Sequence, residues 1–351
     1  MAVETNNQNS EALVDIVVVN YNGRRFLSKC LKSLSLQTES RFRAFIIDNA
    51  SNDHVDEYLL PPDERFIIIK NQQNLGFAVA CNQGAKLGNA PWIAMLNPDA
   101  VPEKNWLEKT IRFAEQTHSA MVGCKQISLS NPTQLDGVGD VYSPWGLAWR
   151  GGYGWDCSTH IGSGEVFGPC AAAALYSRDA YILAGGFDED FFCYMEDVDL
   201  AFRLRIQGFK AVQCNDAIVH HFGSGISGPR SEFTIYHGTR NRIWTWAKNA
   251  PPILFWLGAP VHATANIAFL LRSLFHGRFM ITGKAIIDAL GDFPRILRKR
   301  KEIQSNRKCR TIKILRSMNF SLVDLIRRAP DIRPLKNQPS RSGDENAQHR
   351  E

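Results

Sequence analysis

Short, almost wholly apolar segments alternate with segments of helical periodicity over the first third of the chain, and this alternation strongly constrains the fold. Four strands are expected, DIVVVN, FRAFIIDN, RFIIIKN and PWIAML, at residues 15–20, 42–49, 65–71 and 91–96. Apolar side chains recur at helical spacing in three segments, residues 24–37, 76–88 and 105–116. Strands that are apolar throughout are typical of a largely parallel sheet with helices on both faces. We therefore expect an α/β fold.

The pattern changes over about residues 125–168, where glycine, tryptophan, tyrosine and aspartate follow one another without a clear period. We expect an irregular, aromatic-rich loop or a small antiparallel ribbon that acts as a lid, because long loops in compact domains are usually functional. Regular structure is expected to resume in four segments, residues 170–177, 178–186, 196–208 and 210–221.

The last third contains two features that point to a membrane surface. Residues 253–271 are nineteen residues without a charge, just long enough to span a bilayer, although Pro260, His262 and Asn266 lower their hydrophobicity. Spanning, interfacial insertion and packing within a soluble protein all remain open. Residues 293–328 carry twelve lysines and arginines against two acids. An apolar segment beside a basic one is the two-signal arrangement that holds a protein on anionic lipid, and we expect neither segment to be needed for the sheet.

These features divide the chain into four parts: a disordered lead (1–13), an α/β domain (14–249), a helical, basic, membrane-associating extension (250–333) and a disordered tail (334–351). The lead begins MAVETNNQNS, which has neither the basic nor the apolar part of a signal peptide. The eight cysteines are scattered and indicate reduced core thiols in a cytosolic protein, not a disulfide framework or structural zinc. We expect a cytoplasmic protein attached, peripherally or monotopically, to the inner face of the cell membrane.

Polar clusters follow the expected strands: Asn20-Tyr21-Asn22, Asp48, Asn97-Pro98-Asp99 and Glu196-Asp197. Each cluster alone is ordinary turn chemistry. The carboxyl ends of parallel strands, however, meet at one edge of the sheet, where open α/β sheets bind their ligands. Together the clusters therefore indicate a binding site.

The residue types in these clusters suggest what the site binds. Asp99 can offer oxygen to a hard cation such as Mg²⁺ or Mn²⁺, which fills its remaining positions with phosphate oxygens and water. Asp48 and the turn at 20–22 suit the polar edges of a base and a ribose. Gly76, at the start of an expected helix, lets backbone approach a ligand closely.

The segment GGFDEDFFCYMEDVDLAFRLR, residues 185–205, contains the highest density of candidate catalytic residues. Its six acids lie among Phe187, Phe191, Phe192 and Tyr194, and this apolar company argues against a solvated run of charge. Capping of the following helix is the alternative, but capping requires only one acid. We expect a partly desolvated carboxylate here to act as a general base.

The order of six motifs resembles glycosyltransferase family 2 over about residues 15–245, and most of all its bacterial rhamnosyltransferase-like branch. The motifs are VVVNYNG, DNAS, NLGFAVACNQG, LNPDA, GGFDEDFFCYMEDVDLAFR and VHHFGSGISG. The resemblance implies a GT-A fold, a nucleotide-sugar donor, a divalent cation and inversion at the anomeric carbon.

The resemblance also implies roles for individual residues. Asp197 matches the catalytic base, with Glu196 beside it. LNPDA stands where the family has its Asp-x-Asp metal motif, so Asp99 is an implied metal ligand and Asn97 replaces the first acid. His220 matches a second metal ligand, with His221 as the neighbour that could be confused with it. The residues implied to bind the nucleotide sugar are Asn20, Tyr21, Asn22, Asp48, Asn74, Gly76, Asn97, Arg240 and Asn241, the last two as an Arg-Asn pair near the diphosphate.

We therefore expect an inverting glycosyltransferase that moves a sugar from a nucleoside diphosphate to a lipid-linked or polysaccharide acceptor. dTDP-rhamnose is the first candidate donor, and UDP- and GDP-sugars remain open. One alternative is a sugar-phosphate nucleotidyltransferase, although VVVNYNGRRF lacks the glycine-rich basic signature usual in that class. Another is a non-catalytic carbohydrate-binding scaffold, which the absence of Asp197 would have favoured. No recognition motif accompanies the basic segment, so no nucleic-acid partner is expected.

Overall fold

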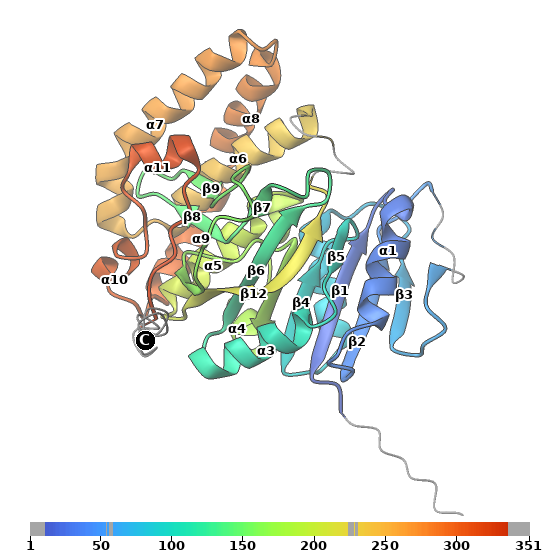
Figure 1. Ribbon diagram of the computed structural model, residues 1–351. Helices are drawn as coiled ribbons and strands as arrows, with labels where there is room; N and C mark the ends of the chain where they lie inside the picture. Colours follow the sequence, from blue (N-terminus) through green and yellow to red (C-terminus); the bar gives the residue numbers. More distant parts are fainter. Residues whose placement is uncertain (1–10, 54, 56–58, 224–227, 229–230, 336–351) are drawn as a thin grey trace, which may run out of the picture.

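The computed structural model describes residues 11–53, 55, 59–223, 228 and 231–335. Most of the predicted disordered lead and tail, residues 1–10 and 336–351, lies outside the described residues. The central layer is a ten-stranded sheet whose main path runs β10-β12-β6-β11-β4-β1-β2-β3 (Figure 1).

The N-terminal half of this sheet is parallel, as predicted. It consists of β1 (Val14–Asn20), β2 (Phe42–Asp48), β3 (Phe66–Lys70) and β4 (Trp92–Leu96), with β1 between β2 and β4. The apolar sides of α1 (Arg24–Ser35) and α3 (Trp106–Thr117) join the core on one face, and α2 (Phe77–Leu87) joins the core on the other. Both faces are therefore covered, which explains why these strands are apolar throughout.

The other half of the sheet is mixed. β11 (Ala173–Ser177) lies antiparallel between β4 and β6 (Met121–Ser128), while β12 (Ala211–His221) runs parallel to β6. The short β5 (Ala100–Pro102) pairs antiparallel with the end of β12 and sets His221 opposite Ala100. This pairing brings the end of β12 beside the segment that follows β4.

The aromatic-rich middle forms short antiparallel pairs, so the ribbon interpretation is confirmed. β8 (Asp140–Tyr142) pairs with β9 (Ala148–Arg150), β7 (Leu135–Gly137) pairs with β6, and β10 (Gly164–Val166) pairs with β12. Tyr142 is fully buried and stacks on Phe167, with Phe202 at its edge. The ribbon is therefore anchored by an aromatic core.

Helices dominate the remainder of the described chain. They are α4 (Arg178–Leu183), the short 3-10 helix η2 (Glu189–Phe191), α5 (Glu196–Ile206), α6 (Glu232–Asn249), α7 (Pro252–Leu274), α8 (Phe279–Gly291), α9 (Phe293–Ser305), α10 (Thr311–Leu315) and α11 (Leu322–Arg327). One apolar cluster joins Phe202 of α5, Trp244 of α6 and Ile296 of α9. The C-terminal helices thus share a core with the α/β region, while α7 and α8 project from it as a pair (Figure 1).

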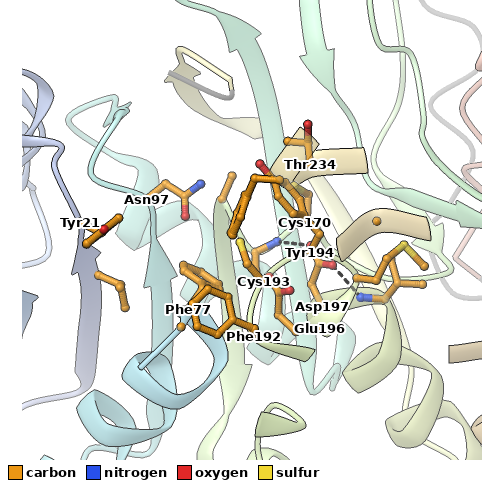
Figure 2. Close-up of a pocket in the computed structure, with 18 of the residues that line it drawn as sticks. Tyr21, Phe77, Asn97, Cys170, Phe192, Cys193, Tyr194, Glu196, Asp197 and Thr234 are labelled. Atoms are coloured by element: carbon orange, nitrogen blue, oxygen red, sulfur yellow. Dashed lines mark hydrogen bonds between the residues drawn. The ribbon is translucent and has the colours of Figure 1, made fainter. Parts of the chain in front are cut away.

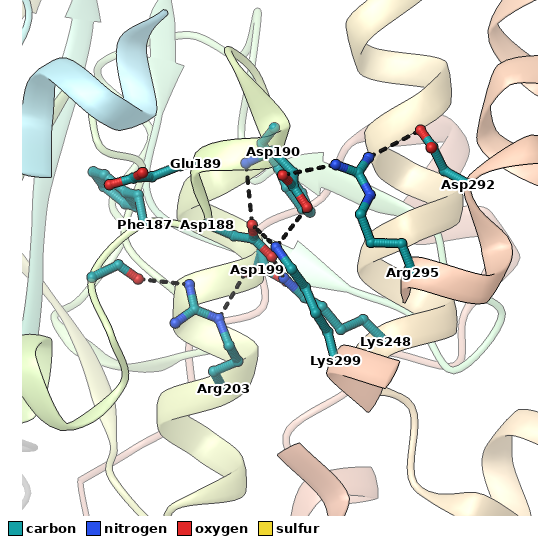
Figure 3. A network of polar contacts seen from close by, with 12 residues as sticks. Phe187, Asp188, Glu189, Asp190, Asp199, Arg203, Lys248, Asp292, Arg295 and Lys299 are labelled. Atoms are coloured by element: carbon teal, nitrogen blue, oxygen red, sulfur yellow. Dashed lines mark hydrogen bonds and ion pairs between the residues drawn. The ribbon is translucent and has the colours of Figure 1, made fainter. Parts of the chain in front are cut away.

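Some basic side chains of residues 293–328 form ion pairs with acids of the same chain, which the sequence analysis did not anticipate. Lys299 Nζ lies 2.5 Å from Asp188 Oδ1 and 2.6 Å from Asp190 Oδ2 (Figure 3). Arg295 Nη1 lies 2.9 Å from Asp190 Oδ1. The segment therefore fastens α9 to the loop that precedes α5. Its basic residues that remain exposed are Arg298, Lys301, Lys308, Arg310, Lys313, Arg316, Arg327 and Arg328.

Candidate active site

A cavity of about 580 Å³ lies at the carboxyl ends of β1 and β4, against the β8–β9 ribbon, the turn before α5 and the first turns of α6. Tyr21 and Asn97 lie on one side of it, and Glu196 and Asp197 on the other (Figure 2). Eight of the predicted site residues line this cavity: Tyr21, Asn22, Asn74, Gly76, Asn97, Asp99, Glu196 and Asp197. In the described part of the chain, the other five predicted residues stand outside its lining: Asn20, Asp48, His220, Arg240 and Asn241.

Asn20 and Asp48 support the cavity from behind. The Asn20 amide donates to Ser51 Oγ at 2.9 Å and lies 3.4 Å from Asp48 Oδ1, and both residues are buried. Asn49, which the sequence analysis passed over, is the lining residue at this strand end. Its amide donates to Asn74 Oδ1 at 2.8 Å, and this bond ties the end of β2 to the loop before α2.

Gly76 allows a close approach, but in this structure the approach is made by protein. Its φ is +86°, and a Cβ there would lie 2.6 Å from Cδ2 of Phe192. The backbone N–H of Ala78, in the first turn of α2, donates to the Phe192 carbonyl at 3.2 Å. Gly76 therefore lets the turn before α5 pack against the start of α2, and any larger residue at this position would displace Phe192.

His221, and not His220, is the histidine beside Asp99. His221 Nε2 lies 3.2 Å from Asp99 Oδ1, whereas His220 Nε2 lies 3.6 Å from Glu103 at a half-exposed position. Of the two histidines, His221 is therefore the one whose side chain contacts Asp99. His221 is also fixed from its other side, because its Nδ1 lies 2.7 Å from Asp136 Oδ2, and Asp136 is paired with Arg150.

Two carboxylates act on the pKa of His221 when no cation is bound. Burial alone would lower the pKa of His221, but hydrogen bonds to Asp136 and Asp99 raise it to about 9. Burial would likewise raise the pKa of Asp136, but Arg150 and His221 lower it to about 2. Asp136 is thus a permanent carboxylate that orients the imidazole.

The residues at this edge fit a divalent cation. The Asp99 carboxylate and His221 Nε2 are neighbouring oxygen and nitrogen donors on the cavity wall, and Asn97 Nδ2 lies 3.4 Å from the same Nε2. A carboxylate behind the distal ring nitrogen, as Asp136 provides, is the usual support of a metal-binding histidine. In the described residues no group of three or more His, Cys, Asp or Glu converges as a metal site. Two protein ligands would therefore leave positions for phosphate oxygens and water.

Asp197 lies in the first turn of α5 and lines the cavity on the side opposite Tyr21 and Asn97 (Figure 2). Its Oδ2 accepts from Ala171 N at 3.1 Å and its Oδ1 from Val198 N at 2.8 Å (Figure 2). Burial raises the pKa of Asp197, and these two backbone donors offset part of that rise. The side chain is therefore held in one orientation, with a basicity suited to accepting a proton.

The turn before α5 is strained and is held by two side chains of α6. Phe192, Tyr194 and Met195 have positive φ values of 63°, 70° and 70°. The Asn241 amide donates to the carbonyls of Phe191, Cys193 and Tyr194 at 2.8–2.9 Å, and Arg240 donates to the carbonyls of Asp190 and Phe191. Arg240 and Asn241 therefore position the turn. In the described residues their side chains bond to carbonyls of this turn, and Arg240 also contacts Asn241 Oδ1 and His237 Nδ1. Strain of this kind persists where the surrounding structure enforces it, commonly at active sites.

Several lining residues were missed from the sequence. They are Asp140, Trp149, Arg150 and Cys170 on or beside the ribbon, and Phe233, Thr234 and Gly238 on α6. The aromatic-rich middle was expected to cover the site as a lid, but no motif marked its acid and its arginine. Residues 224–227, within the VHHFGSGISG motif, lie outside the described residues.

Comparison with known proteins agrees with this geometry. Residues 15–182 match the model of the family described as Glycosyl transferase family 2. The N-acetylglucosaminyl-diphospho-decaprenol L-rhamnosyltransferase of Mycobacterium tuberculosis is 26% identical over 298 residues, which cover 74% of this chain and 92% of that protein. The O-antigen biosynthesis protein RfbC of Myxococcus xanthus is 27% identical over 219 residues, 58% of this chain and 17% of RfbC.

Two solved structures share the fold. The mannosyltransferase PcManGT from Pyrobaculum calidifontis, in complex with GDP-Man and Mn²⁺, superposes with a TM-score of 0.50 at 12% identity, covering 88% of this chain and 86% of that one. GalNAc-T7 with UDP, GalNAc and Mn²⁺ superposes with a TM-score of 0.53 at 14% identity, covering 68% of this chain. The match spans 48% of the GalNAc-T7 chain. At these identities the likeness concerns the fold alone.

Proposed function

The chain contains a glycosyl transferase family 2 domain with a GT-A fold, and on this premise we propose that it is a metal-dependent inverting glycosyltransferase. Its donor is a nucleoside diphosphate sugar, with dTDP-L-rhamnose as the first candidate. The similar mycobacterial protein is named as a rhamnosyltransferase acting on a diphospho-decaprenol acceptor. A lipid-linked glycan of cell-surface synthesis is accordingly the proposed acceptor.

One observation carries this proposal: the cavity is lined by a carboxylate in contact with an imidazole and, apart from this pair, by a buried carboxylate held by backbone donors. Asp99 and His221 form the first, and Asp197 forms the second. An inverting transfer requires such an arrangement, because the acceptor hydroxyl attacks the anomeric carbon from the side opposite the leaving diphosphate. A single base suffices for this displacement, and Asp197 is the oriented candidate.

Each of these residues has a separate role in the displacement. Asp197 accepts the proton of the acceptor hydroxyl while the new bond from oxygen to the anomeric carbon forms and the bond to the diphosphate oxygen breaks. Asp99 and His221 would hold the divalent cation, with Asp136 orienting the imidazole. When bound, the cation neutralises the charge that develops on the leaving diphosphate. Phe192 and Tyr194, held by Asn241 beneath them, help to enclose the cavity.

A panel of nucleotide sugars tests the proposal. We expect dTDP-, UDP- or GDP-sugars to stabilise the protein thermally in the presence of Mn²⁺ and to do so less after chelation. A ligand at one hundred times its Kd adds about 2.7 kcal/mol to the stability of the folded state. Release of nucleoside diphosphate on addition of a polyprenyl-diphosphate-linked sugar then measures transfer. Absence of metal-dependent stabilisation and of transfer across the whole panel would contradict the proposal.

The α7–α8 pair supports attachment to the membrane where a lipid-linked acceptor resides. α7 is the one helix in the described residues that is long and apolar enough to cross a membrane, judged by length and composition, and 22% of its most apolar window is buried. His262 and Asn266 turn inward, to the Trp145 carbonyl and to Arg242. Large apolar side chains turn outward on both helices: Ile253, Trp256, Leu257, Leu271, Leu274, Phe275, Met280, Ile287 and Leu290.

An exposed apolar surface of this size usually marks an interaction site. Because one face of α7 packs on protein, we propose that α7 and α8 lie in the cytoplasmic membrane interface and do not cross the bilayer. Exposed basic residues of 293–328 would add an electrostatic contribution of about 1 kcal/mol for each cation near anionic lipid. The catalytic domain would then work in the cytoplasm, beside the head group of its acceptor.

Flotation with liposomes tests this attachment. The full chain is expected to float with anionic liposomes at low salt and in part at high salt, since the apolar contribution is insensitive to salt. Phe275→Asp with Met280→Asp, at positions 87% and 82% exposed, should abolish the salt-resistant part. Leu36→Asp, at a 57% exposed position on α1, is the control and should float like the unmodified protein. If the unmodified protein remains at the bottom at low salt, the attachment is refuted.

A further inference from the structure

Asp140 is a buried carboxyl group on the cavity wall with an unused oxygen. It is 7% exposed, lines the cavity at the start of β8, and its Oδ2 has no hydrogen-bond partner. Glu196, 5% exposed on the same wall, likewise has an unpaired Oε2. Buried polar atoms are nearly always hydrogen-bonded, and leaving one unpaired destabilises the folded state. Two such atoms on one cavity wall indicate that a ligand completes their bonding.

The β8–β9 ribbon places one acidic and one positively charged side chain on this wall. Asp140 and Arg150 face each other in the β8–β9 register. Gly137 makes room for the arginine, because a Cβ at Gly137 would lie 2.3 Å from Arg150 Cγ. Arg150 pairs with Asp136, the residue that orients His221. The wall therefore extends from the Asp99–His221 pair toward Asp197. Burial and the nearby charge of Asp197 raise the pKa of Asp140, while Arg150 lowers it.

The chemistry of the wall selects its ligand. Asp140 and Glu196 offer carboxyl oxygens, which accept hydrogen bonds from neutral donors and repel a phosphate. Arg150 repels a cation from the same place, and no three metal-binding side chains converge here in the described residues. Trp149, beside Arg150 in the lining, adds an aromatic surface. Hydroxyl groups spaced around a sugar ring satisfy all of these conditions.

We propose that Asp140, with Glu196, forms a subsite for the hydroxyl groups of a sugar ring. The subsite rests on the proposed glycosyl transfer, because it places that ring on the wall between the Asp136–His221 pair and Asp197. The ring belongs either to the donor or to the acceptor, since both bring the same hydroxyl chemistry. The experiment below distinguishes them.

Asp140→Asn is the variant, and Asp156→Asn, an exposed acid just beyond the ribbon, is its control. The thermal midpoint of each is measured alone, with Mn²⁺ and a nucleoside diphosphate, and with Mn²⁺ and the corresponding nucleotide sugar. Asp140→Asn replaces a buried carboxyl group whose Oδ2 lacks a hydrogen-bond partner by an amide of similar size, so its midpoint without ligand should equal or exceed that of the unmodified protein. Stabilisation by the nucleoside diphosphate alone should be unchanged.

The two possible rings then give different results. If the donor ring binds, Asp140→Asn loses the extra stabilisation that the nucleotide sugar gives over the nucleoside diphosphate, with a Kd at least about tenfold weaker, as expected for a lost charged hydrogen bond. If the acceptor ring binds, donor affinity stays and KM for N-acetylglucosaminyl-diphospho-polyprenol rises at least about tenfold. Asp156→Asn should change neither.

Three results would overturn the inference. Unchanged donor affinity and unchanged acceptor KM in Asp140→Asn exclude a sugar subsite. A clear fall in the midpoint without ligand shows that Asp140 serves the fold. If the unmodified protein itself neither binds nor transfers any sugar of the panel, the proposed function has failed, and the subsite fails with it.

Discussion

The ion-pair network behind the active-site turn makes a quantitative prediction about stability. Lys248 Nζ is 1% exposed and contacts Asp188 Oδ2, and it lies 2.8 Å from Asp199 Oδ1 and 4.7 Å from the centre of the Phe191 ring (Figure 3). Asp188 caps η2, which leads directly into the strained turn. Lys248→Met keeps the length of the side chain and removes its charge, leaving two buried carboxylates with one partner fewer.

Removing one partner of a buried ion pair typically costs about 3–5 kcal/mol. Asp188 keeps Lys299, and Asp199 keeps Arg203 at 2.8 Å and Asn249 at 2.6 Å. Because these partners remain, we expect Lys248→Met to lower the free energy of unfolding by about 3 kcal/mol at neutral pH, near the lower end of that range. Lys284→Met is the matched control, because Lys284 is 63% exposed and pairs with Asp288 on the surface of α8. Its loss should be far smaller than that of Lys248→Met, because a solvent-exposed ion pair contributes little to stability.

The pH dependence gives the same reasoning a second test. Burial alone would raise the pKa of Asp188, but Lys248 and Lys299 hold it well below its usual range. A lowered folded-state pKa contributes stability that is fully present above the unfolded pKa of about 3.9 and is lost as the pH falls toward the folded value. The difference between the unmodified protein and Lys248→Met should therefore be largest near pH 7 and shrink below about pH 4.

Urea unfolding followed by circular dichroism at pH 7 and at about pH 3 is the assay. The midpoint and slope together give the free energy of unfolding for each variant. If Lys248→Met loses no more stability at pH 7 than Lys284→Met, the buried network does not stabilise this part of the fold and the reasoning is refuted.

Three further predictions concern the cation edge and the C-terminal helices. Asp99→Ala should weaken Mn²⁺-dependent binding of nucleoside diphosphate at least about tenfold, whereas Asn97→Asp adds a charged oxygen and should preserve or tighten it; calorimetry that shows no metal dependence in any form contradicts both. His221→Gln should weaken the same binding by about 10–100-fold and His220→Gln should leave it within a few-fold, and the reverse order would restore His220 as the ligand. Truncation after Asn249 removes a large part of the apolar cluster around Trp244 and one of the two lysines that pair with Asp188, so it should yield a chain without a cooperative thermal transition; a well-folded fragment that still binds nucleoside diphosphate would show that the C-terminal helices are dispensable.

The parallel strands and the two principal carboxylates were accessible from sequence because they follow from the local pattern of apolar and acidic residues. β1 and β4 are buried on both faces, so their apolar runs show where each ends and place Asp99 at the sheet edge. Asp197 was found because acids among aromatics are unusual on a solvated surface. Both residues line the cavity.

The choice between His220 and His221 could not be made in this way. Side chains alternate along a strand, but β12 shifts its register against β6 between Cys214 and Ile218. An irregularity of this kind interrupts the alternation, and nothing in the local sequence marks it. The pairing with β5, which sets His221 opposite Ala100, exists only in the folded sheet.

Other residues escaped because their roles depend on contacts distant in sequence. Asp140 and Arg150 come close to Asp197 only after the ribbon folds against the Phe167–Phe202 core. Asn241 lies in a motif that the resemblance linked to the diphosphate, yet its amide is occupied by three carbonyls of the turn before α5. Motif spacing gives the position of a residue in the chain but not the direction of its side chain.

The central claim is that Asp197 is the base of a glycosyl transfer, and Asp197→Asn tests it most directly. The amide keeps the size of the side chain and can still accept from one of the two backbone N–H groups, that of Ala171 or that of Val198, but it cannot take up the acceptor proton. With the donor identified from the panel, we predict that kcat falls at least about a hundredfold, the scale of a lost general base, while Kd for the donor with Mn²⁺ stays within a few-fold. A kcat within a few-fold of the unmodified enzyme would contradict the assignment.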